Sequence, residues 1–355
     1  MTIKEHNKHD ILVLIFILTF IFLNILSSPL LSKVFFISND QKDVNLIKTS
    51  NTSLKIVTTL TIIEDVVENI VGKDVPVIVS GTEDPHSYEP TSSEISALAD
   101  ADVIFRMGVA SLEPWWRTDW EDAIVISLIE PGMLKVDPLL GFKNPHVWMD
   151  PNNVKNFTLR VNETLCSLEP IQANRLIFSN NTSNFINILD NLTNEIINAR
   201  KNFIGLKVVV SHPAFFYFFS ENLLNITRVA AIEKGEGKEP SAIDIANVIR
   251  LMEREDCHLI VTNPQHSLEN VYEIARETNS RIALLTPLLN VVVNWNGKTM
   301  SIDTYKGLIE YDLWALAHPI EVPEVIELWG VFLVLIVLIL VVLIIFIYIR
   351  KKPKE

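Results

Sequence analysis

Cysteine is scarce in this sequence, and its scarcity excludes two kinds of architecture. Cys166 and Cys257 are the only two cysteines among 355 residues, too few for a disulfide framework. They fall in different predicted lobes, so we do not expect them to form a bridge. The apolar amino-terminal segment contains no cysteine, which excludes a lipid-modified amino-terminal cysteine.

Basic residues are also in short supply. The chain has 30 lysines and arginines against 43 aspartates and glutamates, a formal net charge of −13. Four of the basic residues lie among the last six, so the remainder is more acidic still. Because an acidic surface repels phosphate backbones, nucleic acid is excluded as a partner. The H-E-x-x-H motif of zinc proteases is absent too.

Long apolar runs occur only at the two ends. Residues 328–349 are 22 residues without a charge, about 33 Å as a helix and enough to cross a bilayer. The basic tail 350–355 follows directly, which predicts a cytoplasmic carboxyl terminus by the positive-inside rule. We therefore expect a transmembrane anchor over 325–349, a cell-membrane location, and an ectodomain facing outside.

The amino-terminal segment 1–32 allows two interpretations. Its apolar stretch follows Lys4 and Lys8, as in a signal peptide, but no clear cleavage site follows. A cleaved signal peptide and a retained signal anchor therefore both remain open. The polar stretch 33–53 is expected to be a linker.

From residue 54 onward, short apolar strands alternate with helical patterns. This order predicts an α/β fold of two lobes, each a mostly parallel four-stranded sheet flanked by helices. The amino-terminal lobe is predicted at 54–150 and the carboxyl-terminal lobe at 206–319. The expected strands are 54–60, 75–80, 102–107, 123–128, 207–211, 226–232, 258–262 and 281–285. The expected helices are 62–71, 92–99, 213–223, 241–254, 267–278 and 303–317.

Between the lobes, residues 151–205 contain no strand-like run. Instead, an apolar stripe recurs there at helical spacing, formed by Phe185, Ile188, Leu189, Leu192, Ile196 and Ile197. The simplest expectation is one long helix that joins the two lobes.

Four polar residues share one topological position, because each follows a predicted strand. His86 and His146 belong to the first lobe, and His212 and Asp303 to the second. The carboxyl ends of parallel strands are where open α/β sheets bind ligands. Three imidazoles and one carboxylate would make a complete tetrahedral set for a zinc-like cation. Taken singly, each has a simpler explanation: a solvated histidine, or Asp303 as a helix N-cap. A metal site is favoured because all four residues occur at the same position, after a predicted strand.

The segments that carry these residues resemble a known family. GTEDPHSYEPTSSEISALADADVIF, NPHVWMDPNNV and VVVSHPAFFYF are similar to the zinc/manganese solute-binding proteins of ABC importers, whose two lobes are joined by a rigid helix. The likeness covers residues 54–318. It implies that His86, His146, His212 and Asp303 are the metal ligands, and that the partner is an ABC permease in the same membrane.

The sequence departs from this family in two places. Residues 117–141 contain no histidine, whereas zinc-specific members often carry a His-rich acidic loop in this lobe. Asn263-Pro264-Gln265 stands where the family often has an acid before the proline.

The expected function is an extracytoplasmic receptor, and not an enzyme, that captures a divalent transition metal and delivers it to the permease. Imidazole ligands favour Zn²⁺, with Mn²⁺ as the alternative. Two other functions remain open: a metal-stabilised surface adhesin or interaction protein, and a zinc hydrolase.

Overall fold

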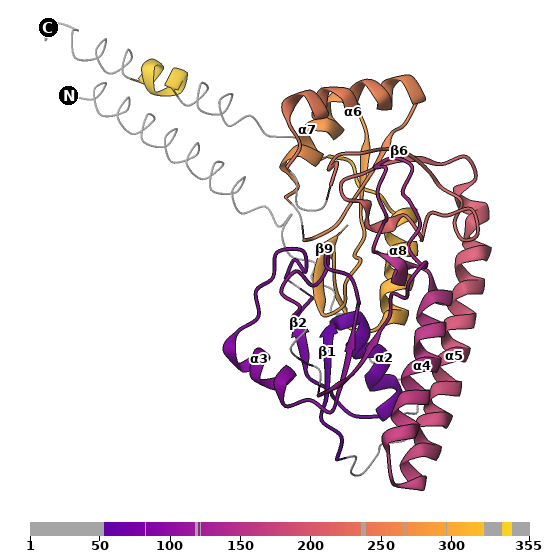
Figure 1. The fold of residues 1–355 in the computed structure, drawn as a ribbon. Coiled ribbons are helices and arrows are strands. Elements are labelled where there is room, and N and C mark those ends of the chain that lie inside the picture. The colour runs from indigo at the N-terminus through magenta and orange to yellow at the C-terminus, as the bar shows by residue number, and fades with distance from the viewer. Residues whose placement is uncertain are drawn as a thin grey trace, which may run out of the picture.

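The computed structural model describes residues 53–322, except 82, 118–119, 121, 236–238, 266 and 296, together with residues 336–342. Two sheet-based lobes lie one above the other, and a pair of long helices runs along one side of both (Figure 1). The second half of the chain therefore builds a lobe of the same type as the first half.

The amino-terminal lobe is a parallel sheet with strand order β2-β1-β3-β4. The central strand β1 is buried along its whole length, as expected for a strand covered on both faces. Helix α3 begins with a capping box in which Thr91 and Glu94 satisfy each other's backbone N–H groups. The elements are β1 (Ile56–Leu60), α2 (Thr61–Val71), β2 (Val77–Val79), α3 (Ser92–Ala99), β3 (Val103–Arg106) and β4 (Ile124–Ser127).

The carboxyl-terminal lobe repeats this arrangement in the order β6-β5-β7-β8, again all parallel. The predicted fold class of two lobes with parallel four-stranded sheets is confirmed. The elements are β5 (Lys207–Val210), β6 (Thr227–Ala231), α6 (Ala242–Glu255), β7 (Leu259–Thr262), α7 (Glu269–Glu277), β8 (Arg281–Leu284) and α8 (Tyr305–Ala317).

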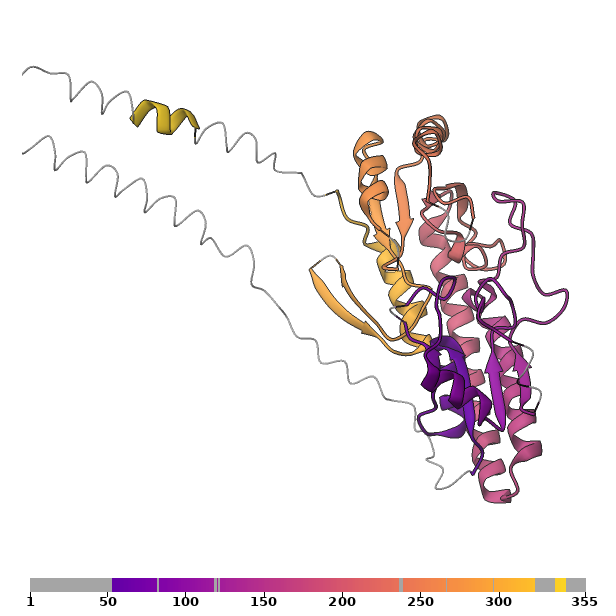
Figure 2. The same cartoon turned by 60° about the vertical axis from the view of Figure 1, so that its left-hand side comes forward.

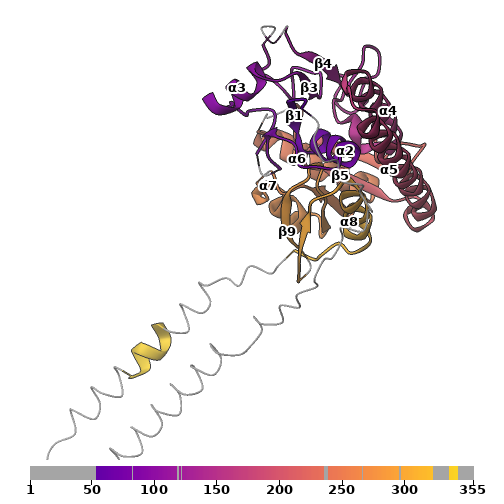
Figure 3. The ribbon, with the colours of Figure 1, turned by 90° about the horizontal axis from the view of Figure 1, so that it is seen from below.

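The connection between the lobes consists of two helices where one was predicted. Helix α4 (Pro151–Leu168) ends at Glu169, whose extended backbone (ψ 115°) suits a residue that precedes a proline. Helix α5 (Gln172–Ala199) then runs back beside α4 and packs against α2 in one lobe and α8 in the other (Figure 3). Helix α5, which carries the predicted apolar stripe, therefore contacts both lobes.

The main element missed from the sequence is a hairpin in the carboxyl-terminal lobe. Strands β9 (Val291–Trp295) and β10 (Lys298–Ile302) pair antiparallel and project from the body (Figure 2). In β9, buried and exposed residues alternate, as in a strand with one face on the core. The helix predicted at 213–223 is present only as a short 3-10 helix, Pro213–Phe215. Two further 3-10 helices are Val147–Met149 and Arg200–Phe203.

The predicted membrane segments need correction. Within the part of the chain that the structure describes, no helix is both long and apolar enough to cross a bilayer. Within the predicted anchor 325–349, the structure describes residues 336–342, which are helical. The rest of the anchor, the basic tail and the amino-terminal segment lie outside the described residues. This finding overturns the predicted localisation of an outward-facing ectodomain held in the cell membrane by a carboxyl-terminal helix.

Two carboxyl groups of α2 hold the second lobe against the first. Asp65 Oδ2 accepts a hydrogen bond from the backbone N–H of Tyr305 at 3.0 Å, and Glu64 Oε2 accepts one from Asn290 Nδ2 at 3.0 Å. Burial raises the pKa of Asp65 to about 7. Burial, with the neighbouring Glu68 carboxylate, raises the pKa of Glu64 to about 7 as well. The contact between the lobes is therefore sensitive to pH.

We expect Asp65→Asn to become more stable than the wild type as the pH rises from about 4 to about 7. In this interval the folded wild type keeps a proton on Asp65 that the unfolded chain has lost, so its stability falls with rising pH. The asparagine has no such proton to lose, yet its amide oxygen can still accept from Tyr305. The gain at pH 8 is at most about 4 kcal/mol. Urea denaturation across the pH range measures it, with exposed Asp100→Asn as the control. A difference between Asp65→Asn and wild type that did not vary with pH would contradict the prediction.

Candidate metal centre

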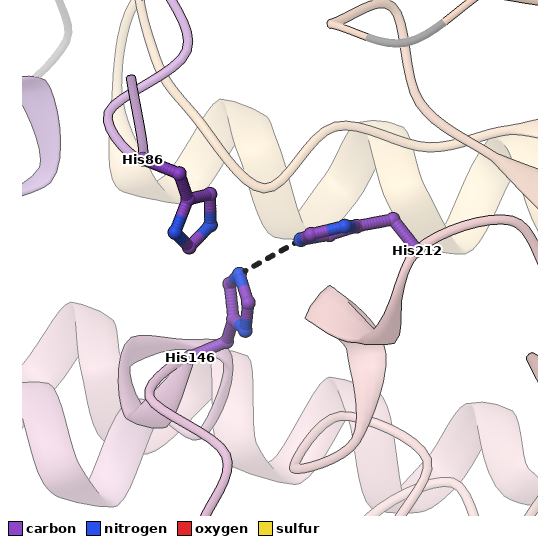
Figure 4. A group of neighbouring side chains, drawn as sticks. All are labelled: His86, His146 and His212. Carbon is purple, nitrogen blue, oxygen red and sulfur yellow. Dashed lines mark hydrogen bonds between the residues drawn. The ribbon is translucent and has the colours of Figure 1, made fainter. Parts of the chain in front are cut away.

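Three of the four predicted ligands meet between the lobes. The side chains of His86, His146 and His212 offer ring nitrogens that all lie within 4.8 Å of one another (Figure 4). Their ring centroids are 5.1 to 5.8 Å apart. His146 and His212 are almost fully buried, at 2% and 3% exposed. These are the residues that the strand-end pattern singled out.

Each histidine is placed by an element that ends at the cleft. His86 lies in a turn that follows β2, and His212 is the second residue after the end of β5. His146 precedes the 3-10 helix Val147–Met149, which leads into α4. The carboxyl ends of parallel strands and the start of the connecting helix therefore converge on one point.

The Nε2 atoms of His146 and His212 are 3.3 Å apart. Two nitrogens bound to one tetrahedral zinc at 2.0–2.1 Å would be separated by about 3.3 to 3.4 Å. Two nitrogens that both carry lone pairs repel each other, so this spacing favours a cation in the space that they face.

For His86 and His212, the other ring nitrogen is held by an acceptor. His86 Nδ1 lies 2.6 Å from the backbone oxygen of Ser111, and His212 Nδ1 lies 2.8 Å from Glu233 Oε2. A carbonyl or carboxylate oxygen can only accept, so Nδ1 must carry the hydrogen in both rings. In the neutral form of each ring, Nε2 then carries the lone pair that a metal needs.

His146 is oriented by a buried network. Its Nδ1 lies 3.0 Å from Asn144 Oδ1. The amide orientation of Asn144 is defined because its Nδ2 donates to the backbone oxygen of Pro213 at 2.9 Å and to Asp137 Oδ2 at 3.3 Å. Asp137 in turn accepts two bonds of 2.8 Å from Arg228. A buried ion pair therefore supports the orientation of His146, as outer-shell groups do at metal sites.

The three imidazoles line a small cavity of about 20 Å³. That volume holds about one water-sized particle. The other residues of its wall are Asp84, Pro85, Leu112, Trp148, Asn263, Gln265, Pro287 and Leu288. The space beside the three imidazoles is therefore about the size of a single ion.

The structure does not bring Asp303 into this cluster. Asp303 is exposed, and its Oδ1 accepts a hydrogen bond of 2.7 Å from Ser301 Oγ. It follows β10 of the unpredicted hairpin, so it does not follow the last strand of the parallel sheet. The residues that come after that strand, β8, are the ones that reach the cavity, and they include Pro287 and Leu288. The N-cap of α8 is Thr304.

At the edge of the site the two lobes touch backbone to backbone. A Cβ built on Gly81 would lie 1.5 Å from the backbone oxygen of Leu289. Only glycine allows this approach. The same glycine offers its own backbone oxygen to Gln265 Nε2 at 3.2 Å.

Known proteins share both the sequence pattern and the fold. The family model described as zinc-uptake complex component A, periplasmic, matches residues 56–318. A putative metal-binding protein of Thermotoga maritima is 25% identical over 69% of this chain and 88% of its own length. The manganese-binding lipoprotein MntA of Halalkalibacterium halodurans is 30% identical over 56% of this chain and 69% of its own. The iron-binding protein YfeA of Yersinia pestis is 35% identical, but over only 34% of this chain and 40% of its own.

Solved structures agree on the fold. The crystal structure of ZnuA superposes with a TM-score of 0.61 at 24% identity, covering 74% of this chain and 97% of that one. The laminin-binding protein Lmb of Streptococcus agalactiae gives a TM-score of 0.63 at 21% identity, covering 75% and 98%. With the match over residues 56–318, the chain belongs to the zinc-uptake component A family of metal-binding, substrate-binding receptors of ABC transporters.

Proposed function

We propose that this protein captures a divalent transition metal, with zinc preferred over manganese, and delivers it to an ABC permease. The observation that carries the proposal is the set of three imidazoles whose Nε2 atoms face one buried point while Nδ1 of each is held by an acceptor. His86, His146 and His212 are the proposed ligands.

The donor chemistry supports zinc. Imidazole nitrogen suits Zn²⁺, whereas Mn²⁺ prefers carboxylate, carbonyl and water oxygen. Among the described residues, the cluster contains no carboxylate that directly joins the three histidines. Glu233 acts one step away, through His212 Nδ1, where it makes the imidazole a stronger donor.

The geometry argues against a zinc hydrolase. Catalytic zinc also has three protein ligands, but it needs a water and a substrate beside it. A cavity of about 20 Å³ is small for an ion, a water and a substrate together. Its one acidic wall residue, Asp84, already accepts hydrogen bonds from the backbone N–H of His86 and from Ser87 Oγ. No contact among the described residues specifically favours an adhesin.

Transport also requires release. Helix α5 packs against both lobes, which opposes a wide hinge motion and favours small movements of the loops that carry the histidines. The loop of His86 is the most exposed of the three. We therefore propose that release begins there, when the permease engages the receptor.

A competitive titration of the metal-free full chain with Zn²⁺ and Mn²⁺ tests the function. We expect one-to-one zinc binding that exceeds manganese binding at pH 7.5. Because each ligand must be a neutral imidazole, binding should weaken by roughly tenfold or more at pH 5. Absence of one-to-one binding would contradict a receptor function. Manganese preferred over zinc would contradict only the metal assignment.

A further inference from the structure

A fourth polar group faces the same cavity, in a loop that the three histidines do not use. Gln265 follows β7 and lines the cavity together with His86, His146 and His212. Its side chain crosses between the lobes, because Nε2 donates a hydrogen bond of 3.2 Å to the backbone oxygen of Gly81. This bond identifies the amide nitrogen, since a carbonyl can only accept. The orientation of the amide is thereby defined.

The amide oxygen of Gln265, Oε1, is the atom that suggests a ligand. Gln265 Oε1 is buried, and it accepts no hydrogen bond from any residue that the structure describes. A buried acceptor without a partner costs about 1 to 3 kcal/mol. Native proteins keep such groups rarely, and commonly where a ligand completes them. Gln265 lines a cavity with three imidazoles, and an amide oxygen has the chemistry of a cation ligand.

The backbone of this loop is also fixed. The N–H of Gln265 donates to Asn263 Oδ1 at 3.2 Å, and Asn263 is fully buried. Pro264 lies between them and restricts the backbone further. The side chain of Gln265 is therefore held at both ends before any metal arrives, which lowers the ordering cost of binding.

The size of the cavity then limits what can complete the coordination. A volume of about 20 Å³ matches one water-sized particle. Structural zinc is nearly always four-coordinate, and the wall is the nearest source of a fourth donor. Asp303 lies outside the wall, and both oxygens of Asp84 already accept hydrogen bonds.

Building on the proposed function, we propose that Gln265 is the fourth metal ligand, through its amide oxygen Oε1. The donor set is then three neutral imidazoles and one neutral amide, without a carboxylate in direct contact. Such a set selects nitrogen-preferring ions, zinc above all, and disfavours manganese. This ligand also links the ion to the opposite lobe, because Nε2 of the same amide donates to the backbone oxygen of Gly81.

The test compares the full chains of wild type, Gln265→Ala, Gln265→Glu and the control Gln172→Ala, which alters an exposed glutamine of α5. Zinc and manganese affinities are measured by competition, and the visible absorption of bound Co²⁺ reports the coordination. We expect Gln265→Ala to bind zinc at least about tenfold more weakly, with a changed Co²⁺ spectrum. Gln265→Glu should shift the preference toward manganese, because a carboxylate suits that ion. Gln172→Ala should match wild type.

The two hypotheses can fail separately. If Gln265→Ala and Gln265→Glu keep wild-type zinc affinity and Co²⁺ spectra while His212→Ala loses zinc, Gln265 is not a ligand and the receptor function stands. If wild type itself binds no zinc, both are overturned. Gln265→Glu retains the length of the side chain, so it decides the question even if the alanine variant folds poorly.

Discussion

Replacing His212 by alanine is expected to abolish tight one-to-one zinc binding. The side chain is 3% exposed, lies 3.3 Å from His146 Nε2 and is oriented by Glu233. Removing it deletes one of the three proposed ligands. Loss of an outer-shell partner already costs about 10- to 100-fold, so loss of the ligand should exceed about 100-fold. The measurement is a competitive zinc titration against a chelator.

The matched control is His258→Ala. His258 lies in the same lobe and bonds to Asp256 at 3.0 Å at the surface, away from the cavity. Its removal should leave zinc affinity unchanged. Wild-type zinc affinity in His212→Ala would refute the metal centre itself. Thermal unfolding of both variants in a chelator separates a lost ligand from a damaged fold.

A second large effect is expected in stability, from Asp137→Ala. Asp137 is fully buried and accepts both bonds from Arg228, whose side chain is only 7% exposed. Removing one member of a buried pair leaves the other charge without compensation, at a cost of about 3 to 5 kcal/mol. Because Asp137 also accepts from Asn144, which orients His146, zinc affinity should fall as well. Urea denaturation and zinc titration measure the two effects.

The control for this result is Asp190→Ala, which removes a solvent-exposed ion pair. Asp190 pairs with Lys155 at 2.6 Å, but the two side chains are 45% and 32% exposed. Solvent screens such pairs, so its removal should cost no more than about 1 kcal/mol. If both alanine variants lost the same stability, burial of the Asp137 pair would not be what stabilises the fold.

The parts of the fold that were predictable share a simple physical cause. Runs such as Val208–Val210 must be buried on both faces, which requires a parallel sheet with helices around it. Histidines placed after such runs lie near the carboxyl ends of the strands, and His86 and His212, which follow strands of the two different sheets, meet between the lobes. Both conclusions follow from the spacing of the apolar residues along the sequence.

Asp303 could not be placed in the same way, because its position depends on the hairpin before it. Val291 and Val293 are buried while Val292 is 60% exposed, an alternation over too few residues to stand out between β8 and α8. With the hairpin present, Asp303 follows an antiparallel strand and lies at the surface. The position of a residue relative to a sheet can be predicted only if every strand before it in the sequence has been recognised.

Gln265 was harder still to find. An amide beside a proline has no ligand signature in a sequence, and glutamine is usually a solvated surface residue. What distinguishes it is that its amide nitrogen donates to Gly81, while its amide oxygen is buried and has no hydrogen-bond partner among the described residues. Only the unusual Asn263-Pro264-Gln265 segment, which departs from the family pattern, pointed to this loop.

The backbone contact between Gly81 and Leu289 has a kinetic consequence. Where two chain segments touch with no side chain between them, there is no soft group whose rotation could open a passage. An ion can pass between these two segments only when a whole loop shifts, and loop motions are far slower than side-chain rotations. We therefore expect a long residence time even where affinity is moderate. A receptor with this property would lose little of its cargo while it diffuses, and would surrender it on collision with a partner that moves the loop.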